Sequence, residues 1–315
     1  MNAKSWVPIF GEFESSADEL LFKGSRPTAT EAGSVAAAIA LSNLRFGTGI
    51  VRAQITFDQV NVNSVAELLL WYDPVTRNML TAGIGGGGFM CAIRVFNQTS
   101  LSGSKWSYLN SSGTSANLRA GRAYELAVDI VGSRVTLLVD SVRALATNLS
   151  APLPESQVGV FCLGEANCHI SNFRVDATKP RAFVVMEYSK DFNELYEEVV
   201  KPAVESLGLD VKRADETYGP GLILSDITGK LLDARVVIAE ITPPNPNVYF
   251  EVGYSFAIGK PPILLAVEGT ELPFDVSPFR TLFYENTIKG KKAVEDGLKS
   301  HVRAVLGIQP HEVVG

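Results

Sequence analysis

Residues 238–253 read IAEITPPNPNVYFEVG, and this stretch decides the fold of the second half of the chain. A short apolar run ends near Glu240, a loop rich in Pro and Asn follows, and apolar spacing typical of a helix begins near Val248. We predict Asn247 as the N-cap, because its side chain can accept a hydrogen bond from an early helix N–H. Glu251 then lies one turn into the helix and faces the end of the preceding strand.

Outward from this stretch, apolar runs typical of buried strands alternate with helical periodicity. Strands are predicted at residues 182–186, 209–213, 235–241, 262–267 and 281–284. Helices are predicted at residues 191–207, 222–232, 248–258 and 288–306. This alternation is typical of a parallel, doubly wound sheet, whose strands end at one rim where such folds bind ligands. We therefore predict an α/β domain with a flavodoxin-like, parallel five-stranded sheet over residues 179–315.

Residues 1–178 have a different pattern, with short strands separated by turn residues. The clearest predicted strands are residues 49–57, 66–72, 124–131, 134–139, 158–163 and 169–175. Many closely spaced strands without a long helix predict an all-β sandwich, or jelly roll. The glycine run at residues 85–88 lacks the lysine of a phosphate-binding loop, so we interpret it as a flexible hairpin tip.

Composition indicates a globular protein with substantial cores. The 315 residues are 46% hydrophobic and 20% charged, with a net charge of −6. Residues 1–179 carry 14 basic and 14 acidic side chains, so the α/β half carries the whole excess of acidic groups. No bulk basic surface or long apolar segment is evident, so neither nucleic-acid nor membrane binding is expected. Three cysteines and no export signal predict a cytoplasmic protein with reduced thiols.

Three acidic side chains of the α/β half follow strand ends or begin helices. Glu251 and Asp226 lie at loop-to-helix entries, and Glu240 lies at a strand end. A half-buried carboxylate at such a rim can act as a nucleophile or stabilise a developing sugar cation. A glutamate in the first turn of a helix also complements the helix dipole, so spacing alone leaves a purely structural role open. Convergence of all three carboxylates would favour chemistry.

The α/β half resembles the nucleoside 2-deoxyribosyltransferase-like and TIR-like family of bacterial proteins. The resemblance extends from Ala182 to Tyr284, about a third of the chain. Its segments are FVVMEYSKDFNELYEEVVKPAVESLGLDVKRADE, GPGLILSDI, ARVVIAEITPPNPNVYFEVGYSFAIGKPPILL and LPFDVSPFRTLFY. The most specific segment is NPNVYFEVG.

The resemblance implies chemistry at the N-glycosidic bond of a ribose. It assigns Glu251 as the catalytic residue and implies substrate-binding roles for Met186, Glu187, Tyr188, Asp226, Glu240, Asn245 and Asn247. Glu187 and Tyr188 replace the usual Pro-Phe pair, which adds a charge and a hydroxyl to the expected pocket. Glu240 replaces a usual Asp.

The leading hypothesis is an effector that hydrolyses NAD+ as its substrate when it assembles into a homo-oligomer, in antiphage or stress defence. It needs no cofactor and no metal site. A constitutive nucleoside or nucleotide N-glycosidase, or a 2-deoxyribosyltransferase, is an alternative. A non-catalytic domain that binds a nucleotide or acts as an interaction scaffold is another.

The β half is similar to concanavalin-like and laminin-G-like sandwiches. Its supporting segments are LSNLRFGTGIVRAQITF, AELLLWYDP, LRAGRAYELAVDIVGSRVTLLVDSV and VGVFCLGEANCHISNFRV. The resemblance implies a carbohydrate or protein ligand, or a role in sensing or oligomerisation. Trp106 lies in the loop-like segment SGSKWSYLN and is the predicted ligand contact, since an aromatic ring can stack on a sugar. Packing in a core is the alternative for this side chain.

Overall fold

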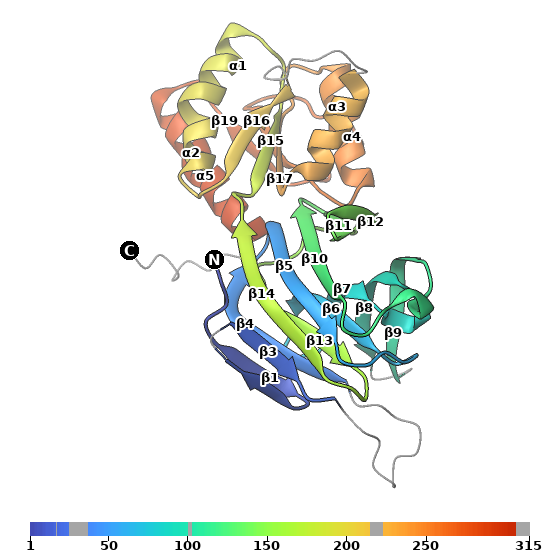
Figure 1. Cartoon of the computed structure of the whole chain (residues 1–315). Helices are drawn as coiled ribbons and strands as arrows, with labels where there is room; N and C mark the ends of the chain where they lie inside the picture. Colours follow the sequence, from blue (N-terminus) through green and yellow to red (C-terminus); the bar gives the residue numbers. More distant parts are fainter. Residues whose placement is uncertain (17, 25–36, 100–102, 215–222, 307–315) are drawn as a thin grey trace. The chain divides into compact units, whose positions relative to one another are not determined.

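The computed structural model describes residues 1–16, 18–24, 37–99, 103–214 and 223–306. The chain folds into two compact units (Figure 1). The first, the sandwich unit, contains Met1–Ile130, Arg134–Asn148 and Leu153–Thr178. The second, the α/β unit, contains Val131–Ser133, Leu149–Pro152 and the chain from Lys179 onward.

The sandwich unit consists of two antiparallel sheets, with seven strands each among the described residues. The first sheet has the order β1 (Trp6–Phe10), β4 (Ala38–Phe46), β13 (Ser156–Leu163), β6 (Val65–Tyr72), β7 (Met79–Ile84), β8 (Cys91–Thr99) and β9 (Gly103–Ser112). The second has the order β12 (Val142–Asn148), β11 (Arg134–Val139), β10 (Ala123–Val131), β5 (Gly49–Phe57), β14 (Cys168–Ala177), β3 (Glu19–Phe22) and β2 (Phe13–Ser15). The predicted β-sandwich is confirmed.

Alternation along the strands explains why these sequences form sheets. In β5, Val51, Ala53, Ile55 and Phe57 are buried while the residues between them are half-buried, as expected when successive side chains point to opposite faces. The predicted loop around Trp106 is wrong, because Gly103–Ser112 forms strand β9 and pairs with β8. Turn-type residues such as Ser and Gly misled the prediction there, since the partner strand determines the conformation.

The glycine run also differs from the predicted flexible hairpin tip. It includes a short 3-10 helix, η1 (Gly86–Gly88), between β7 and β8. A side chain at Gly86 would collide with the buried carboxylate of Glu67 and the guanidinium of Arg94. Glycine is therefore required here by close packing over a buried ion pair.

The α/β unit contains one parallel sheet in the order β16 (Asp210–Arg213), β15 (Arg181–Val185), β17 (Val236–Glu240), β18 (Ile263–Val267) and β19 (Thr281–Tyr284). Its helices are α1 (Lys190–Leu195), η3 (Tyr196–Val200, a π-helical turn), α2 (Lys201–Glu205), α3 (Ile223–Asp233), α4 (Pro246–Ala257) and α5 (Ile288–Leu306). The predicted five-stranded parallel sheet with helices is confirmed. The predicted helix at 191–207 is the continuous run of α1, η3 and α2.

Helices cover both faces of this sheet (Figure 1). Ala182 and Val184 of β15 pack against α1, α2 and α5, whereas Phe183 and Val185 pack against α3 and α4. Two buried faces require a nearly continuous apolar strand, which is why this strand reads AFVV. Among the described helices, none combines the length and apolarity that crossing a bilayer requires.

The strand order reverses direction at the centre of the sheet. From β15 the chain passes to β16 on one side, and from β17 it passes to β18 on the other side. The carboxyl ends of β15 and β17 therefore lie at the point where neighbouring connections diverge, which opens a crevice in folds of this kind. The loops after these two strands carry most of the predicted site residues.

A buried lysine stabilises the opposite end of the α/β unit. Lys260 follows α4 and is only 5% exposed. Its Nζ donates to the carbonyl oxygens of Leu231 at 2.9 Å and Ala234 at 2.8 Å, and to that of Leu232. These carbonyls lie at the C-terminal end of α3, where carbonyl groups lack helical partners and the helix dipole is negative.

We expect Lys260→Met to lower the free energy of unfolding of the α/β unit by about 2–4 kcal/mol, because methionine removes the donor to the Leu231 and Ala234 carbonyls and leaves that of Leu232 with only the Ser133 N–H. Circular dichroism at 222 nm during thermal unfolding measures this effect, since α1–α5 belong to this unit. All three tryptophans (Trp6, Trp71 and Trp106) lie in the sandwich unit, so their fluorescence provides an internal reference. Equal helix-melting midpoints in the variant and the parent would contradict the prediction.

Candidate functional site

The first part of the site follows directly from β15. Met186 is buried, Glu187 is half-buried, and Tyr188 is 48% exposed. The strand ends at Val185, so these three residues no longer follow the strand pleat, and all three side chains line the same cavity.

The second part follows β17 and begins α4. The helix starts at Pro246, and its N-cap is Asn245, whose Oδ1 accepts from the Asn247 N–H at 2.9 Å. The prediction that Asn247 is the cap is therefore wrong by two residues. Proline is favourable in the first helical turn because it has no N–H that needs a partner. The helix therefore begins at Pro246, earlier in the chain than predicted.

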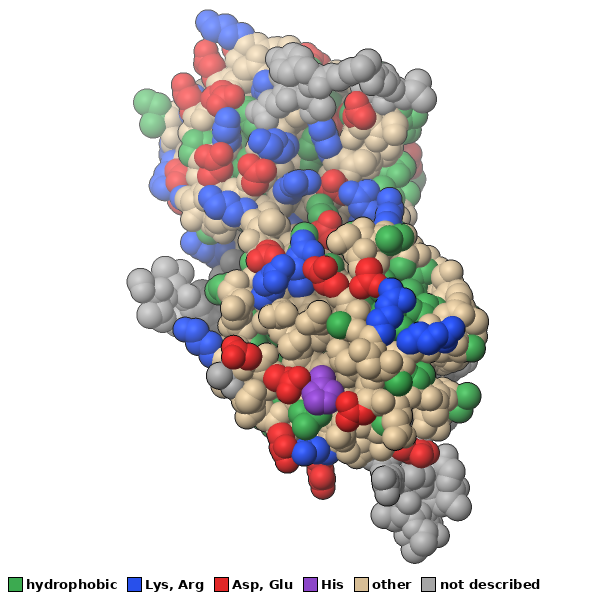
Figure 2. All heavy atoms as spheres, in the orientation of Figure 1, with side chains coloured by type: hydrophobic (Ala, Val, Ile, Leu, Met, Phe, Trp, Pro, Cys, Tyr) green, Lys and Arg blue, Asp and Glu red, His purple; other side chains and the backbone are tan. Residues whose placement is uncertain are grey.

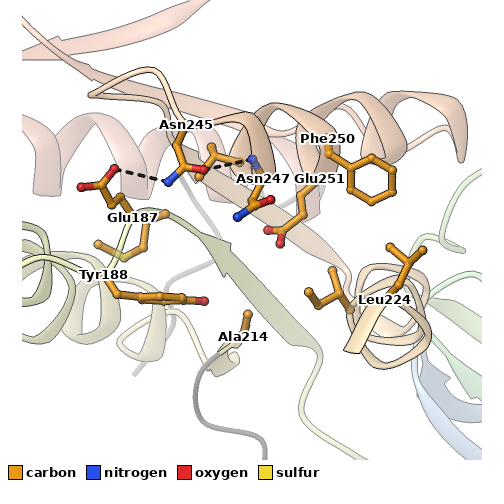
Figure 3. Close-up of a pocket in the computed structure, with 11 residues that line it drawn as sticks. Glu187, Tyr188, Ala214, Leu224, Asn245, Asn247, Phe250 and Glu251 are labelled. Atoms are coloured by element: carbon orange, nitrogen blue, oxygen red, sulfur yellow. Dashed lines mark hydrogen bonds between the residues drawn. The ribbon is translucent and has the colours of Figure 1, made fainter. Parts of the chain in front are cut away.

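The same asparagine joins the two parts. Its Nδ2 donates to Glu187 Oε2 at 3.3 Å, so one amide caps α4 and also holds the carboxylate that follows β15 (Figure 3). The site is thus assembled from two loops that are distant in the sequence, since Asn245 follows Glu187 by 58 positions.

A cavity of about 790 Å³ lies between these loops and α3. This volume is within the range of small-molecule sites in proteins. Its described lining consists of Met186, Glu187, Tyr188, Ala214, Leu224, Ile227, Asn245, Asn247, Val248, Phe250 and Glu251. In Figure 3 the Glu251 carboxylate points from α4 toward the space between Tyr188, Ala214 and Leu224.

Glu251 has an unusual environment for a carboxylate. It is only 8% exposed, and among the described residues no hydrogen-bond partner of its carboxylate is found. Burial raises the pKa of Glu251 to about 7, while the positive charge of Lys230 acts in the opposite direction. The other buried residues of α4 are Val248, Val252 and Ser255. A perturbed, half-desolvated carboxyl group in a cavity is a frequent feature of catalytic sites.

Two predicted site residues do not line the cavity. Asp226 lies in the first turn of α3 and is exposed, whereas Leu224 and Ile227, on the neighbouring face, contribute to the lining. Helical spacing explains this difference, because positions three apart share a face and Asp226 lies to one side. The prediction of a substrate contact at Asp226 is not supported by its position.

Glu240 is buried in the fold instead of opening into the cavity. It is 2% exposed, and its Oε1 accepts from the Thr242 N–H at 2.8 Å. Burial raises the pKa of Glu240 to about 7, and the hydrogen bonds with Thr242 and Tyr284 oppose that shift. Asp226 and Glu240 therefore do not line the cavity together with Glu251, and the acidic side chain that does is Glu187.

Sequence reasoning did not identify five of the described lining residues as part of the site: Ala214, Leu224, Ile227, Val248 and Phe250. Each is an apolar residue near a strand end or a helix start, positions that resemble ordinary core positions in sequence. Leu224 and Phe250 are 56% and 48% exposed, respectively, which shows that they surround an opening and do not fill a core. Their exposure in the folded chain distinguishes Leu224 and Phe250 from core residues.

The predicted ligand contact of the sandwich unit lies in a packed cluster. The Trp106 ring contacts Phe96 and Phe161, with centroids 5.2 and 5.1 Å away, and Arg94 lies over it at 4.1 Å. The ring is half-buried against a hydrophobic cluster. Its contacts correspond to the core-packing alternative, because the surfaces available for stacking on a sugar already meet protein groups.

The described residues contain no group of three or more His, Cys, Asp or Glu side chains positioned to share a metal ion. Cys91, Cys162 and Cys168 are free and buried. On the face drawn in Figure 2, basic and acidic side chains are interspersed and do not gather into one large patch.

Comparisons with known proteins cover the sandwich unit. The chain matches no family model, and it matches no curated protein. Among solved structures, it is similar to a carbohydrate-binding module from Bacillus subtilis, CBM66, at 14% identity and a TM-score of 0.43, over 55% of this chain and 95% of that chain. It is also similar to a family 16 endo-glucanase from Bacteroides ovatus, at 10% identity and a TM-score of 0.39, over 54% and 94% of the two chains.

A further similar structure is a β-1,3-1,4-glucanase (lichenase) derived from a mouse hindgut metagenome, at 10% identity and a TM-score of 0.37, over 54% and 92% of the two chains. All three similarities concern a jelly-roll sandwich of the concanavalin-like kind in the N-terminal region. At such identities and scores they carry no argument about ligand or activity.

Proposed function

We propose that the α/β unit cleaves the N-glycosidic bond of NAD+ and releases nicotinamide, with Glu251 as the catalytic residue. The observation that carries this proposal is the position of Glu251: a buried carboxyl group with a raised pKa, facing a cavity at the reversal point of a parallel sheet.

The chemistry requires little more than a well-placed carboxylate. The bond between C1′ of the ribose and the pyridinium nitrogen breaks, and its electron pair returns to the ring nitrogen, so nicotinamide leaves as a neutral molecule. Positive charge develops at C1′, where the Glu251 carboxylate stabilises it or bonds to it. Water then adds at C1′ and loses a proton, which gives ADP-ribose, nicotinamide and H+. Asn245 and Asn247 can donate hydrogen bonds to sugar hydroxyls from the same side of the cavity.

A nucleoside N-glycosidase or 2-deoxyribosyltransferase is the second candidate. A neutral base leaves more readily when it receives a proton, and a carboxyl group with a pKa of about 7 is partly protonated at neutral pH. Glu251 would then act as a general acid. The two candidates therefore differ in which protonation state of the same side chain is active.

The resemblance adds self-association and antiphage or stress defence to the proposal, with the sandwich unit sensing a carbohydrate or protein ligand or promoting assembly. A cytoplasmic location is part of this proposal. A non-catalytic scaffold is the remaining alternative.

The decisive experiment measures base release by mass spectrometry. The full chain is incubated over a concentration series with NAD+ and, separately, with a panel of neutral nucleosides, and Glu251→Gln serves as the control. We expect nicotinamide release that rises more than linearly with protein concentration. Base release from the nucleosides alone would establish the second candidate, and no turnover at any concentration would favour the scaffold.

The pH dependence separates the two mechanisms. If the Glu251 carboxylate stabilises C1′, we expect kcat/KM for NAD+ to rise as the pH increases through about 7 and to level off above it, because only the ionised form is active. A general acid gives the opposite profile, with activity lost above pH 7. Initial rates between pH 5 and 9 in buffers of constant ionic strength measure this. A profile without a transition near pH 7 would contradict both assignments of Glu251.

A further inference from the structure

The charged side chains among the described residues that line the cavity are all acidic. Glu187 and Glu251 provide two carboxylates, and no Lys, Arg or His occurs among its described lining residues. A ligand group inside this cavity thus meets two acidic side chains, and no cation belongs to the described lining.

Two nearby cations are engaged elsewhere. Lys230 lowers the pKa of Glu251, but its Nζ donates to the Ala214 carbonyl at 3.4 Å, and the side chain lines a separate cavity beside β16. The Arg213 guanidinium is 8% exposed, lies over the Tyr196 ring at 4.5 Å, and donates to Asn193. Arg213 also lies 5.2 Å from the centre of the Tyr188 ring. Neither cation belongs to the described lining of the main cavity.

The apolar part of the lining fits a flat ring. Tyr188 and Phe250 each line the cavity and are 48% exposed, and in Figure 3 Tyr188 lies on the opposite side of the view from Phe250 and Leu224. Exposed aromatic faces bind planar rings, and they bind cationic rings more strongly because of their negative π surface. The aromatic side chains and the acidic side chains of the lining therefore both favour a ligand with a positively charged ring.

We infer that Glu187 determines the specificity of the cavity. It makes the cavity bind preferentially the part of a nucleoside that carries a cationic aromatic ring and no phosphate. For NAD+ this is the nicotinamide riboside end, with both phosphates outside the cavity. The inference deepens the proposed function and rests on it for the identity of the sugar. Asn245 holds the Glu187 carboxylate at the cavity by the 3.3 Å hydrogen bond described above.

Binding measurements test the inference without requiring turnover. The probes are 1-methylnicotinamide, which is a cation, and nicotinamide, a neutral molecule of almost the same shape, each titrated into the full chain by calorimetry or ligand-observed NMR. At a pH of about 8.5, where Glu251 is mostly ionised, we expect the cation to bind about fivefold more tightly, as two partly buried negative charges at moderate distance would produce. A pair of substrates extends the test, and nicotinamide riboside should bind more tightly than its 5′-phosphate.

The variant Glu187→Gln should reduce the preference for the cation by about threefold or more. Glutamine keeps an acceptor for Asn245, so the hydrogen bond and the fold are retained, and an unchanged thermal midpoint verifies this. Asp226→Asn makes the same change of net charge on α3 outside the cavity, and it should leave the preference unchanged.

Equal binding of the two probes by the parent chain would overturn the inference, as would an effect of Asp226→Asn as large as that of Glu187→Gln. Tighter binding of the 5′-phosphate would also overturn it. A preference for the cation without any release of nicotinamide would support the inference on specificity while contradicting the proposed hydrolysis, so the two can fail separately.

Discussion

Replacing Glu251 by Gln is expected to lower the rate of nicotinamide release by about 10³-fold or more, which corresponds to about 4 kcal/mol of lost transition-state stabilisation. The amide has nearly the same shape as the carboxyl group and carries no charge, so it cannot stabilise a cation at C1′ or bond to it. Because the side chain is buried beside Val248 and Val252, the amide should occupy the same position. Rates at saturating NAD+ with equal protein concentrations measure the effect.

The matched control is Glu240→Gln. Glu240 is also a buried glutamate with a pKa raised to about 7, but it does not line the cavity. Glutamine retains an oxygen that can accept from the Thr242 N–H, so the loop before α4 should keep its conformation. We expect less than about a threefold change in rate, because the substituted side chain does not line the cavity. Equal losses in the two variants would show that neutralising a buried glutamate perturbs the fold in general and would remove the catalytic assignment.

The largest stability effect is expected at Arg94 in the sandwich unit. Arg94 and Glu67 are 5% and 1% exposed and form an ion pair at 2.7 Å, with Thr81 donating to the same carboxylate oxygen at 2.7 Å. Arg94→Met should lower the free energy of unfolding by about 3–5 kcal/mol, because it leaves a buried carboxylate without its cation. The expected fall in the midpoint is about 10 °C for a unit of this size. Tryptophan fluorescence monitors it, since every tryptophan lies in this unit.

A second variant separates the charge from the packing. Arg94 also stacks on Trp106, so the single change removes an aromatic contact as well as a charge. In the double variant Glu67→Gln and Arg94→Met, the glutamine can still accept from Thr81 and no buried charge remains. We expect it to recover about 1–3 kcal/mol relative to Arg94→Met. A double variant no more stable than the single one would mean that the loss arises from packing over Trp106 alone.

Local sequence determined the elements of the α/β unit. The five strands and the later helices lie within one or two residues of the predicted ranges, and Ile288–Leu306 matches its prediction at both ends. Periodicity is a property of a few consecutive residues, so it can be read without knowing the rest of the chain. The spacing after Glu240 likewise places Glu251 one turn into a helix, whichever asparagine caps it.

Which side chains meet was decided only by the tertiary structure. Asp226, Glu240 and Glu187 all lie near strand ends or helix starts, yet only Glu187 shares a cavity with Glu251. Trp106 was expected in a loop and instead lies in a strand under Arg94, a partner twelve residues earlier in the sequence. Strand order, strand pairing and the face that each side chain occupies depend on contacts between residues that are distant in sequence. A shift of one residue in a strand, or of about a quarter turn in a helix, moves a side chain from a cavity to a core or to solvent.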